Sequence, residues 1–137
     1  MNAAPSDQAS PAPAKRCVLI VDDEDSVRSV TKRMLQLNGF EVLVARDGLE
    51  GIELFSRDGD RIEIVLLDMT MPRMGGDEVL KQIRIAKPLV RVVLMSGYSR
   101  REAGPLLGDG SITGFLQKPF TFAQLKEQLR LLPESAA

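Results

Sequence analysis

Four charged side chains in this sequence come directly after apolar runs. Asp22 and Asp23 follow one run, Asp68 follows a second, and Lys118 follows a third. Runs of this length and composition indicate buried parallel strands. Ligands in an open α/β sheet bind at the carboxyl ends of the strands, so we expect three carboxylates and one ammonium to share one edge. Together they can bind a divalent cation and an anion.

The three aspartates favour a magnesium site. Like charges at close range oppose joint ionisation unless a cation lies among them, and Mg²⁺ prefers carboxylate oxygens together with water and phosphate. The chain has no histidine and one cysteine, which argues against zinc or copper. The alternative is that the acids cap the following helix, a role that Asp25 can fill without Asp22 and Asp23.

An aspartate beside Mg²⁺ can attack phosphorus and form an aspartyl phosphate. Transfer then depends on positioning and charge neutralisation, for which Lys118 offers a compact cation. Taken alone, Lys118 would more often be a solvated surface lysine, but Pro119 and the three neighbouring strand ends reverse that preference. Pro119 follows Lys118, and X–Pro bonds can be cis. Ser96 ends another apolar run and can either offer its hydroxyl to a phosphoryl oxygen or form a turn before Gly97.

Strand and helix patterns alternate around these residues and predict five β–α units. The expected strands are 17–21, 41–45, 62–67, 91–95 and 114–116. The expected helices are 26–38, with an inward stripe of Val27, Val30, Met34 and Leu37; one capped by Asp47 and carrying Leu49, Ile52 and Phe55; 77–86; and one after a capping box at 121–124. Residues 99–110 form a poor helix because Gly104-Pro105 and further glycines interrupt them. This is an α/β fold with a parallel sheet and helices on both faces.

Length and composition fit a single domain. We assign residues 1–14 to a flexible tail or linker, 15–132 to the domain and 133–137 to a C-terminal tail, within 137 residues. A net charge of −1 gives no bulk attraction to nucleic acid. No run approaches about 18 apolar residues, so we expect no membrane contact by this chain. One cysteine permits no internal disulfide, which fits a cytoplasmic location.

Four motifs, in this order and in these strand contexts, resemble those of bacterial two-component response-regulator receiver domains, the CheY-like family. They are Val21-Asp22-Asp23-Glu24, Leu67-Asp68-Met69-Thr70-Met71-Pro72, Met95-Ser96-Gly97-Tyr98 and Leu116-Gln117-Lys118-Pro119-Phe120. The resemblance covers about residues 15–132. It implies a flavodoxin-like (βα)5 three-layer sandwich whose parallel five-stranded sheet has the order 2-1-3-4-5.

The resemblance also implies roles at the metal site. Asp68 would be the phosphoacceptor. Asp22 and Asp23 would form the acidic pair, with Asp23 the more direct ligand of Mg²⁺. Asp68 would complete the carboxylate ligands, and Thr70 would lend its backbone carbonyl.

Three further positions match residues that respond to the phosphoryl group in this family. Lys118 would contact the phosphate, and Ser96 would be the hydroxyl switch residue. Phe115 would be the switch aromatic, without the hydroxyl that a tyrosine would bring. The broken segment at 99–110 departs from the family, in which the corresponding helix belongs to the output face.

The function expected from this resemblance is that of a phosphoacceptor in a two-component phosphorelay. A histidine kinase or histidine phosphotransfer protein would donate the phosphoryl group, and an interaction surface for an unknown effector would switch. Self-hydrolysis is expected, but no turnover of an outside substrate. Residues 95–99 resemble receivers of hybrid sensor histidine kinases more than those of DNA-binding regulators.

Two other functions have different expectations. A phosphorylation-independent receiver, acting only as a binding module, would lack one of the key residues, and none is missing. A haloacid-dehalogenase-like phosphohydrolase would carry its nucleophile on the first motif strand with a second acid two residues later. Here the candidate nucleophile, Asp68, follows the third strand, and position 70 is Thr.

Overall fold

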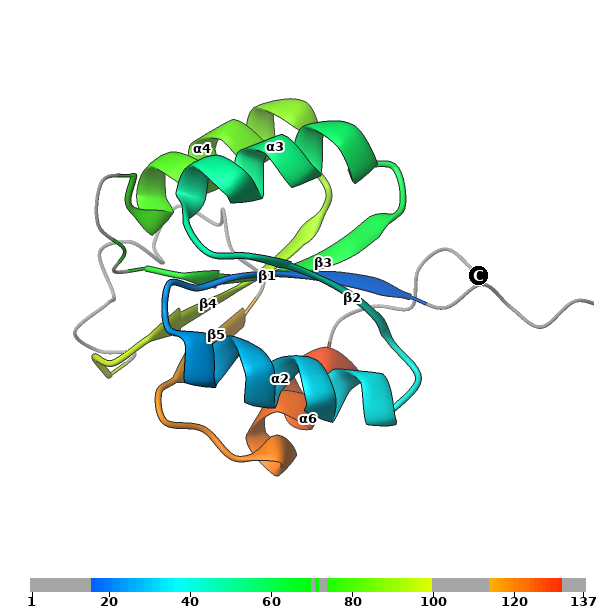
Figure 1. The fold of residues 1–137 in the computed structure, drawn as a ribbon, viewed down its shortest axis with the longest axis vertical. Coiled ribbons are helices and arrows are strands. Elements are labelled where there is room, and N and C mark those ends of the chain that lie inside the picture. The colour runs from blue at the N-terminus through cyan, green and yellow to red at the C-terminus, as the bar shows by residue number, and fades with distance from the viewer. Residues whose placement is uncertain (1–15, 70, 72–73, 100–113, 132–137) are drawn as a thin grey trace, which may run out of the picture.

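The fold is a parallel sheet between two layers of helices (Figure 1). The computed structural model describes residues 16–69, 71, 74–99 and 114–131. The strands are β1 (Cys17–Val21), β2 (Glu41–Ala45), β3 (Ile62–Asp68), β4 (Arg91–Ser96) and β5 (Gly114–Gln117). The helices are α2 (Asp25–Leu37), α3 (Gly48–Asp58), α4 (Gly76–Ala86) and α6 (Phe122–Leu131).

The strand order is β2-β1-β3-β4-β5, which confirms the predicted flavodoxin-like topology. All pairs are parallel, and the register aligns the strand ends: Val21 pairs with Ala45 and Leu67, and Asp68 pairs with Met95. Helices α3 and α4 cover one face, while α2 and α6 cover the other (Figure 1). The carboxyl ends of the three central strands therefore meet at one edge.

Burial on both faces explains the apolar runs. Every residue of β1 is buried, and its side chains alternate between two core clusters. Leu19 and Val21 pack with Phe55 and Val79 of α3 and α4. Ile20, on the other face, packs in a cluster with residues of α2 and α6. A central strand packed on both faces in this way fixes the position of the residues that follow it, here Asp22 and Asp23.

The inward face of α2 matches the predicted stripe only in part, since Met34 packs against the core but other members of the stripe do not. Thr31 and Leu35 are the buried residues of this helix, whereas Val30 and Leu37 are 54% and 74% exposed. Val30 and Leu37 lie seven residues apart on one row of the helix surface, beside the row that meets the sheet. The prediction counted apolar residues only and so missed the threonine at the centre of the contact.

The helix ends follow the expected capping, with one correction. Asp47 accepts a hydrogen bond from Glu50 N at 2.9 Å at the start of α3. Thr121 and Gln124 form the reciprocal capping box of α6, with bonds of 2.8 and 3.1 Å. Asp25 does not cap α2, because Glu24 is the N-cap residue and Asp25 already lies inside the helix.

The remaining element predictions are accurate to about one residue. Leu49 is exposed rather than inward, while Phe55 and Ile52 pack as expected. Residues 100–113, which include most of the predicted poor helix, lie outside the part of the chain that the structure describes. Within the described part, no helix combines the length and the hydropathy needed to cross a membrane.

Candidate functional site

The strand ends bring the predicted site residues to one edge of the sheet. Asp22 directly follows β1, Asp68 ends β3, and Ser96 ends β4. Backbone hydrogen bonds continue the sheet just past these ends: Asp22 N donates to Ala45 O at 3.1 Å, and Lys118 N donates to Ser96 O at 2.7 Å. The sheet itself therefore positions these residues.

The three aspartates form the expected cluster. One carboxylate oxygen from each of Asp22, Asp23 and Asp68 lies within 4.8 Å of the others. Asp22 and Asp68 are buried, at 0% and 1% exposure, and Asp23 is exposed. Asp22 Oδ1 accepts a hydrogen bond from Glu24 N at 2.9 Å, which fixes its orientation. Two buried carboxylates and a third at the surface make a site open on one side.

Lys118 lies among these acids and is ion-paired. Its Nζ is 2.8 Å from Asp22 Oδ2, 2.8 Å from Glu24 Oε1 and 3.3 Å from Asp68 Oδ2. Burial alone would lower the pKa of Lys118, but the close carboxylates of Asp22, Glu24 and Asp68 raise this pKa above its usual value. The Lys118–Pro119 peptide bond is cis. Lys118 is thus a charged member of the site and not a free surface lysine.

The donor set fits a hard divalent cation. Asp22 Oδ2 is a buried oxygen that contacts the Lys118 ammonium but has no partner with hydrogen-bond geometry, so its capacity to accept is not filled. The clustered donors are carboxylate oxygens, which suit Mg²⁺ better than zinc or copper. Cys17 lies at the start of β1, away from these strand ends. Thr70, the expected carbonyl ligand, lies outside the described residues.

Ser96 and Phe115, the two predicted switch residues, are both buried but lie in different settings. Ser96 is buried, and its Oγ accepts a hydrogen bond from Tyr98 N at 3.0 Å. This is the turn-forming role, one of the two alternatives that the sequence allowed for Ser96. Phe115 is buried in the core between the sheet and helices α3 and α4. Its backbone N donates to Gln128 Oε1 at 3.2 Å. Neither side chain is exposed to solvent.

Two residues of the site were not among the sequence predictions. Glu24 pairs with Lys118 as described, and Arg28 Nη1 donates to the backbone O of Asp22 at 2.8 Å while pairing with Asp25. Glu24 is the N-cap residue of α2, and Arg28 lies in the first turn of that helix, four residues later. Charged residues in the turn that follows an acidic strand end are the signal that could have identified them.

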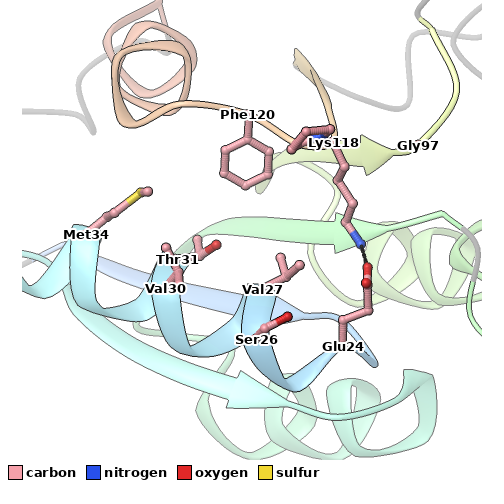
Figure 2. A pocket seen from close by; sticks show the side chains of 10 residues that line it. Glu24, Ser26, Val27, Val30, Thr31, Met34, Gly97, Lys118 and Phe120 are labelled. Carbon is pink, nitrogen blue, oxygen red and sulfur yellow. Dashed lines mark hydrogen bonds and ion pairs between the residues drawn. The ribbon is translucent and has the colours of Figure 1, made fainter.

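A groove of about 500 Å³ opens beside the Glu24–Lys118 pair. Figure 2 shows Lys118 reaching from the segment after β5 to Glu24 at the start of α2, with Phe120 facing that helix. The lining is largely apolar along α2 and includes Val27, Val30 and Met34. The partial exposure of Val30 follows from its place on this groove.

Comparison with known proteins gives one consistent family. The model of the response regulator receiver domain family matches residues 18–130. A sensor kinase, CckA of Brucella abortus (strain 2308), is 35% identical over 117 residues, covering 85% of this chain and 12% of that protein. The response regulator MprA of Mycobacterium leprae (strain TN) is 35% identical over 128 residues, covering 88% of this chain and 54% of that protein. The chain thus spans a small part of the first protein and about half of the second.

A solved structure supports the same relationship. The response regulator TrrA of Thermotoga maritima, in complex with Mg²⁺ and beryllium fluoride, superposes with a TM-score of 0.75 at 31% identity. The match covers 84% of this chain and 96% of that one.

Proposed function

The chain belongs to the response regulator receiver domain family, and on that basis we propose that Asp68 accepts a phosphoryl group in a two-component phosphorelay. Receiver domains are signalling modules that interact with histidine kinases and phosphotransfer proteins. One observation carries the proposal: the buried Asp68 carboxylate lies beside Asp22 and Asp23, with Lys118 Nζ 3.3 Å away. A nucleophilic carboxylate, an oxygen-ligand cluster and a cation are thus in one place.

In the proposed reaction, an oxygen of Asp68 forms a bond to phosphorus as the bond from phosphorus to the donor's leaving atom breaks. The donor is a histidine kinase or a histidine phosphotransfer protein. Its phosphohistidine lies outside this chain, which contains no histidine. Lys118 neutralises charge on the transferred group. Later attack by water on the aspartyl phosphate would release phosphate, so the chain cycles without turning over another substrate.

Receiver domains generally bind Mg²⁺ at an acidic pocket, and we propose that Asp22, Asp23 and Asp68 bind it here, with the Thr70 carbonyl as a further ligand. The bound ion would supply positive charge against the phosphoryl oxygens. The buried and incompletely bonded Asp22 Oδ2 supports this assignment. Asp23 is exposed, so it can adjust to the ion while Asp22 stays fixed.

Ser96 and Phe115 would respond to the phosphoryl group. The Ser96 hydroxyl would exchange its bond with Tyr98 N for one to a phosphoryl oxygen. Phe115, in the strand that pairs with β4, would repack when Ser96 moves. The surface that changes in this way would meet the effector protein.

The proposal is tested by incubating the protein with acetyl phosphate and Mg²⁺ and measuring intact mass. We expect one phosphoryl group on the wild type and none on Asp68→Asn. Chelation of Mg²⁺ and Asp23→Asn should both reduce labelling strongly. Undiminished labelling of Asp68→Asn would disprove the assignment of the phosphoacceptor.

A further inference from the structure

Glu24 lies outside the cluster of aspartates but contacts the same ammonium. We propose that Glu24 is a positioning residue that binds Lys118 in the unphosphorylated protein and competes with the phosphoryl group for it. The inference rests on the proposed function of Asp68 and concerns what limits the access of an anion to Lys118. It predicts that removing the charge of Glu24 makes the site a better anion receptor.

Carboxylates surround the ammonium on several sides. A lysine ammonium has three donors, and three carboxylate oxygens lie within 3.3 Å of Lys118 Nζ, from Asp22, Glu24 and Asp68. A phosphoryl oxygen that approaches Lys118 therefore competes with these three carboxylates, and one of them must give way for close contact. The identity of the displaced carboxylate determines what the approach costs.

Exposure distinguishes the three acceptors. The side chains of Asp22 and Asp68 are 0% and 2% exposed, whereas that of Glu24 is 56% exposed. A buried carboxylate that loses its cation is left without solvent, at a large cost in free energy. A carboxylate at the surface is rehydrated when it leaves. Glu24 is therefore the acceptor that a phosphoryl group displaces.

Local geometry lets Glu24 leave without moving the backbone. Its N donates to Asp22 Oδ1 at 2.9 Å, and its carbonyl accepts from Arg28 N at 3.0 Å, so the main chain is fixed on both sides. Glu24 is the N-cap residue of α2, yet its side chain makes no capping hydrogen bond. Figure 2 shows it directed at Lys118 instead. Rotation about its side-chain bonds alone would free the ammonium.

Lys118 reactivity in the free protein tests the contact itself. Glu24→Gln keeps the size of the side chain and removes its charge, while Asp25→Asn removes a neighbouring exposed charge that does not contact Lys118. Without Mg²⁺ or phosphodonor, we expect acetic anhydride to modify Lys118 about two- to fivefold faster in Glu24→Gln, relative to the other lysines, from the usual strength of an exposed ion pair. Mass spectrometry of peptides measures this ratio. Equal rates in Glu24→Gln, Asp25→Asn and the wild type would overturn the proposal.

Anion affinity tests the competition. Titration calorimetry with beryllium fluoride at saturating Mg²⁺ should show about two- to fivefold tighter binding to Glu24→Gln than to the wild type, with Asp25→Asn close to the wild type. Unchanged or weaker binding to Glu24→Gln, with normal wild-type binding, overturns the role of Glu24 and leaves the proposed function intact. Tighter binding to both variants by the same factor also overturns the role of Glu24, because the loss of any one negative charge near the site would then explain the result. Failure of the wild type to bind contradicts the proposed function as well.

Discussion

Asp22 and Asp68 lie at the carboxyl ends of β1 and β3, where almost none of either side chain reaches solvent. Two carboxylates in such a position need a nearby cation, and Lys118 provides it in this structure. The same arrangement leaves the acids able to accept Mg²⁺. At the scale of single residues, Lys118 thus contributes both to the stability of the fold and to the proposed chemistry.

Replacing Lys118 with methionine should destabilise the folded state. The change leaves Asp22 and Asp68 buried without their cation, and we expect a loss of about 2–4 kcal/mol in the free energy of unfolding at pH 7. Urea denaturation measures this free energy of unfolding. Lys81→Met, at an exposed position of α4, should change stability by less than about 0.5 kcal/mol. Equal stability of Lys118→Met and Lys81→Met would mean that the ion pairs contribute little.

The contribution of Lys118 should depend on pH in a defined direction. Its pKa in the folded protein lies above the usual 10.5, so the folded state retains this proton at a pH where the unfolded chain has lost it. Stability from Lys118 is therefore complete below pH 10.5 and declines as pH rises toward the folded pKa. The difference in stability between the wild type and Lys118→Met should be constant from pH 7 to about 10 and shrink above pH 10.5. A difference in stability that grows as the pH becomes more alkaline would contradict the expected direction of this pH dependence.

The position of the aspartates and Lys118 could be predicted because each follows an apolar run, and parallel strands place such positions at one edge. The additional contact of Lys118 with Glu24 could not be predicted. Glu24 belongs to a run of four acids, Asp22 to Asp25, and the sequence does not say which way each side chain points. That depends on where α2 begins, which Glu24 marks as N-cap.

At the scale of elements, the end of α2 gives a clear stability prediction. Gly39 has a φ of 88°, and the turn after α2 closes with bonds from Gly39 N to Gln36 O and from Phe40 N to Leu35 O. Gly39→Ala should cost about 1–2 kcal/mol because a Cβ disfavours this backbone conformation. Gly97→Ala is the control, since Gly97 lacks a positive φ and a Cβ there has open space. Equal losses of thermal stability in both variants would argue against a conformational cause.

The boundaries of elements were predictable where the sequence contains a clear capping or turn residue. Gly39, Asp47 and the capping box at Thr121 each mark an end that the structure confirms. The inward face of α2 was not predictable from apolar residues, because polar Thr31 takes a central buried position beside the sheet. Hydrophobic periodicity identifies a helix but can misplace its face by one row of side chains.

At the scale of the whole molecule, binding of Mg²⁺ should stabilise the fold by linking the ends of β1 and β3. At a free concentration 100 times its Kd, Mg²⁺ should add about 2.7 kcal/mol to the free energy of unfolding. Thermal unfolding at constant ionic strength measures this. Asp23→Asn should remove most of the increase, whereas Asp60→Asn, an exposed acid outside the cluster, should keep it. An equal increase in both variants would place the ion elsewhere.

The α/β class and the alternation of elements followed from the sequence, but the order of strands did not. Right-handed crossovers and apolar runs are compatible with several orders of five parallel strands. The order 2-1-3-4-5 was predicted from the resemblance of four motifs, among them those around Asp68 and Lys118, and the structure confirms it. It is this order that places β1 beside β3 and brings Asp22 to Asp68.

The most direct test of the account is to identify the residue that carries the phosphoryl group. After incubation with acetyl phosphate and Mg²⁺, reduction with borohydride converts an aspartyl phosphate to homoserine, which peptide mass spectrometry locates. We predict homoserine at position 68 alone. Homoserine at position 22 or 23, or none in a protein that has taken up phosphate, would contradict the assignment of Asp68 as phosphoacceptor.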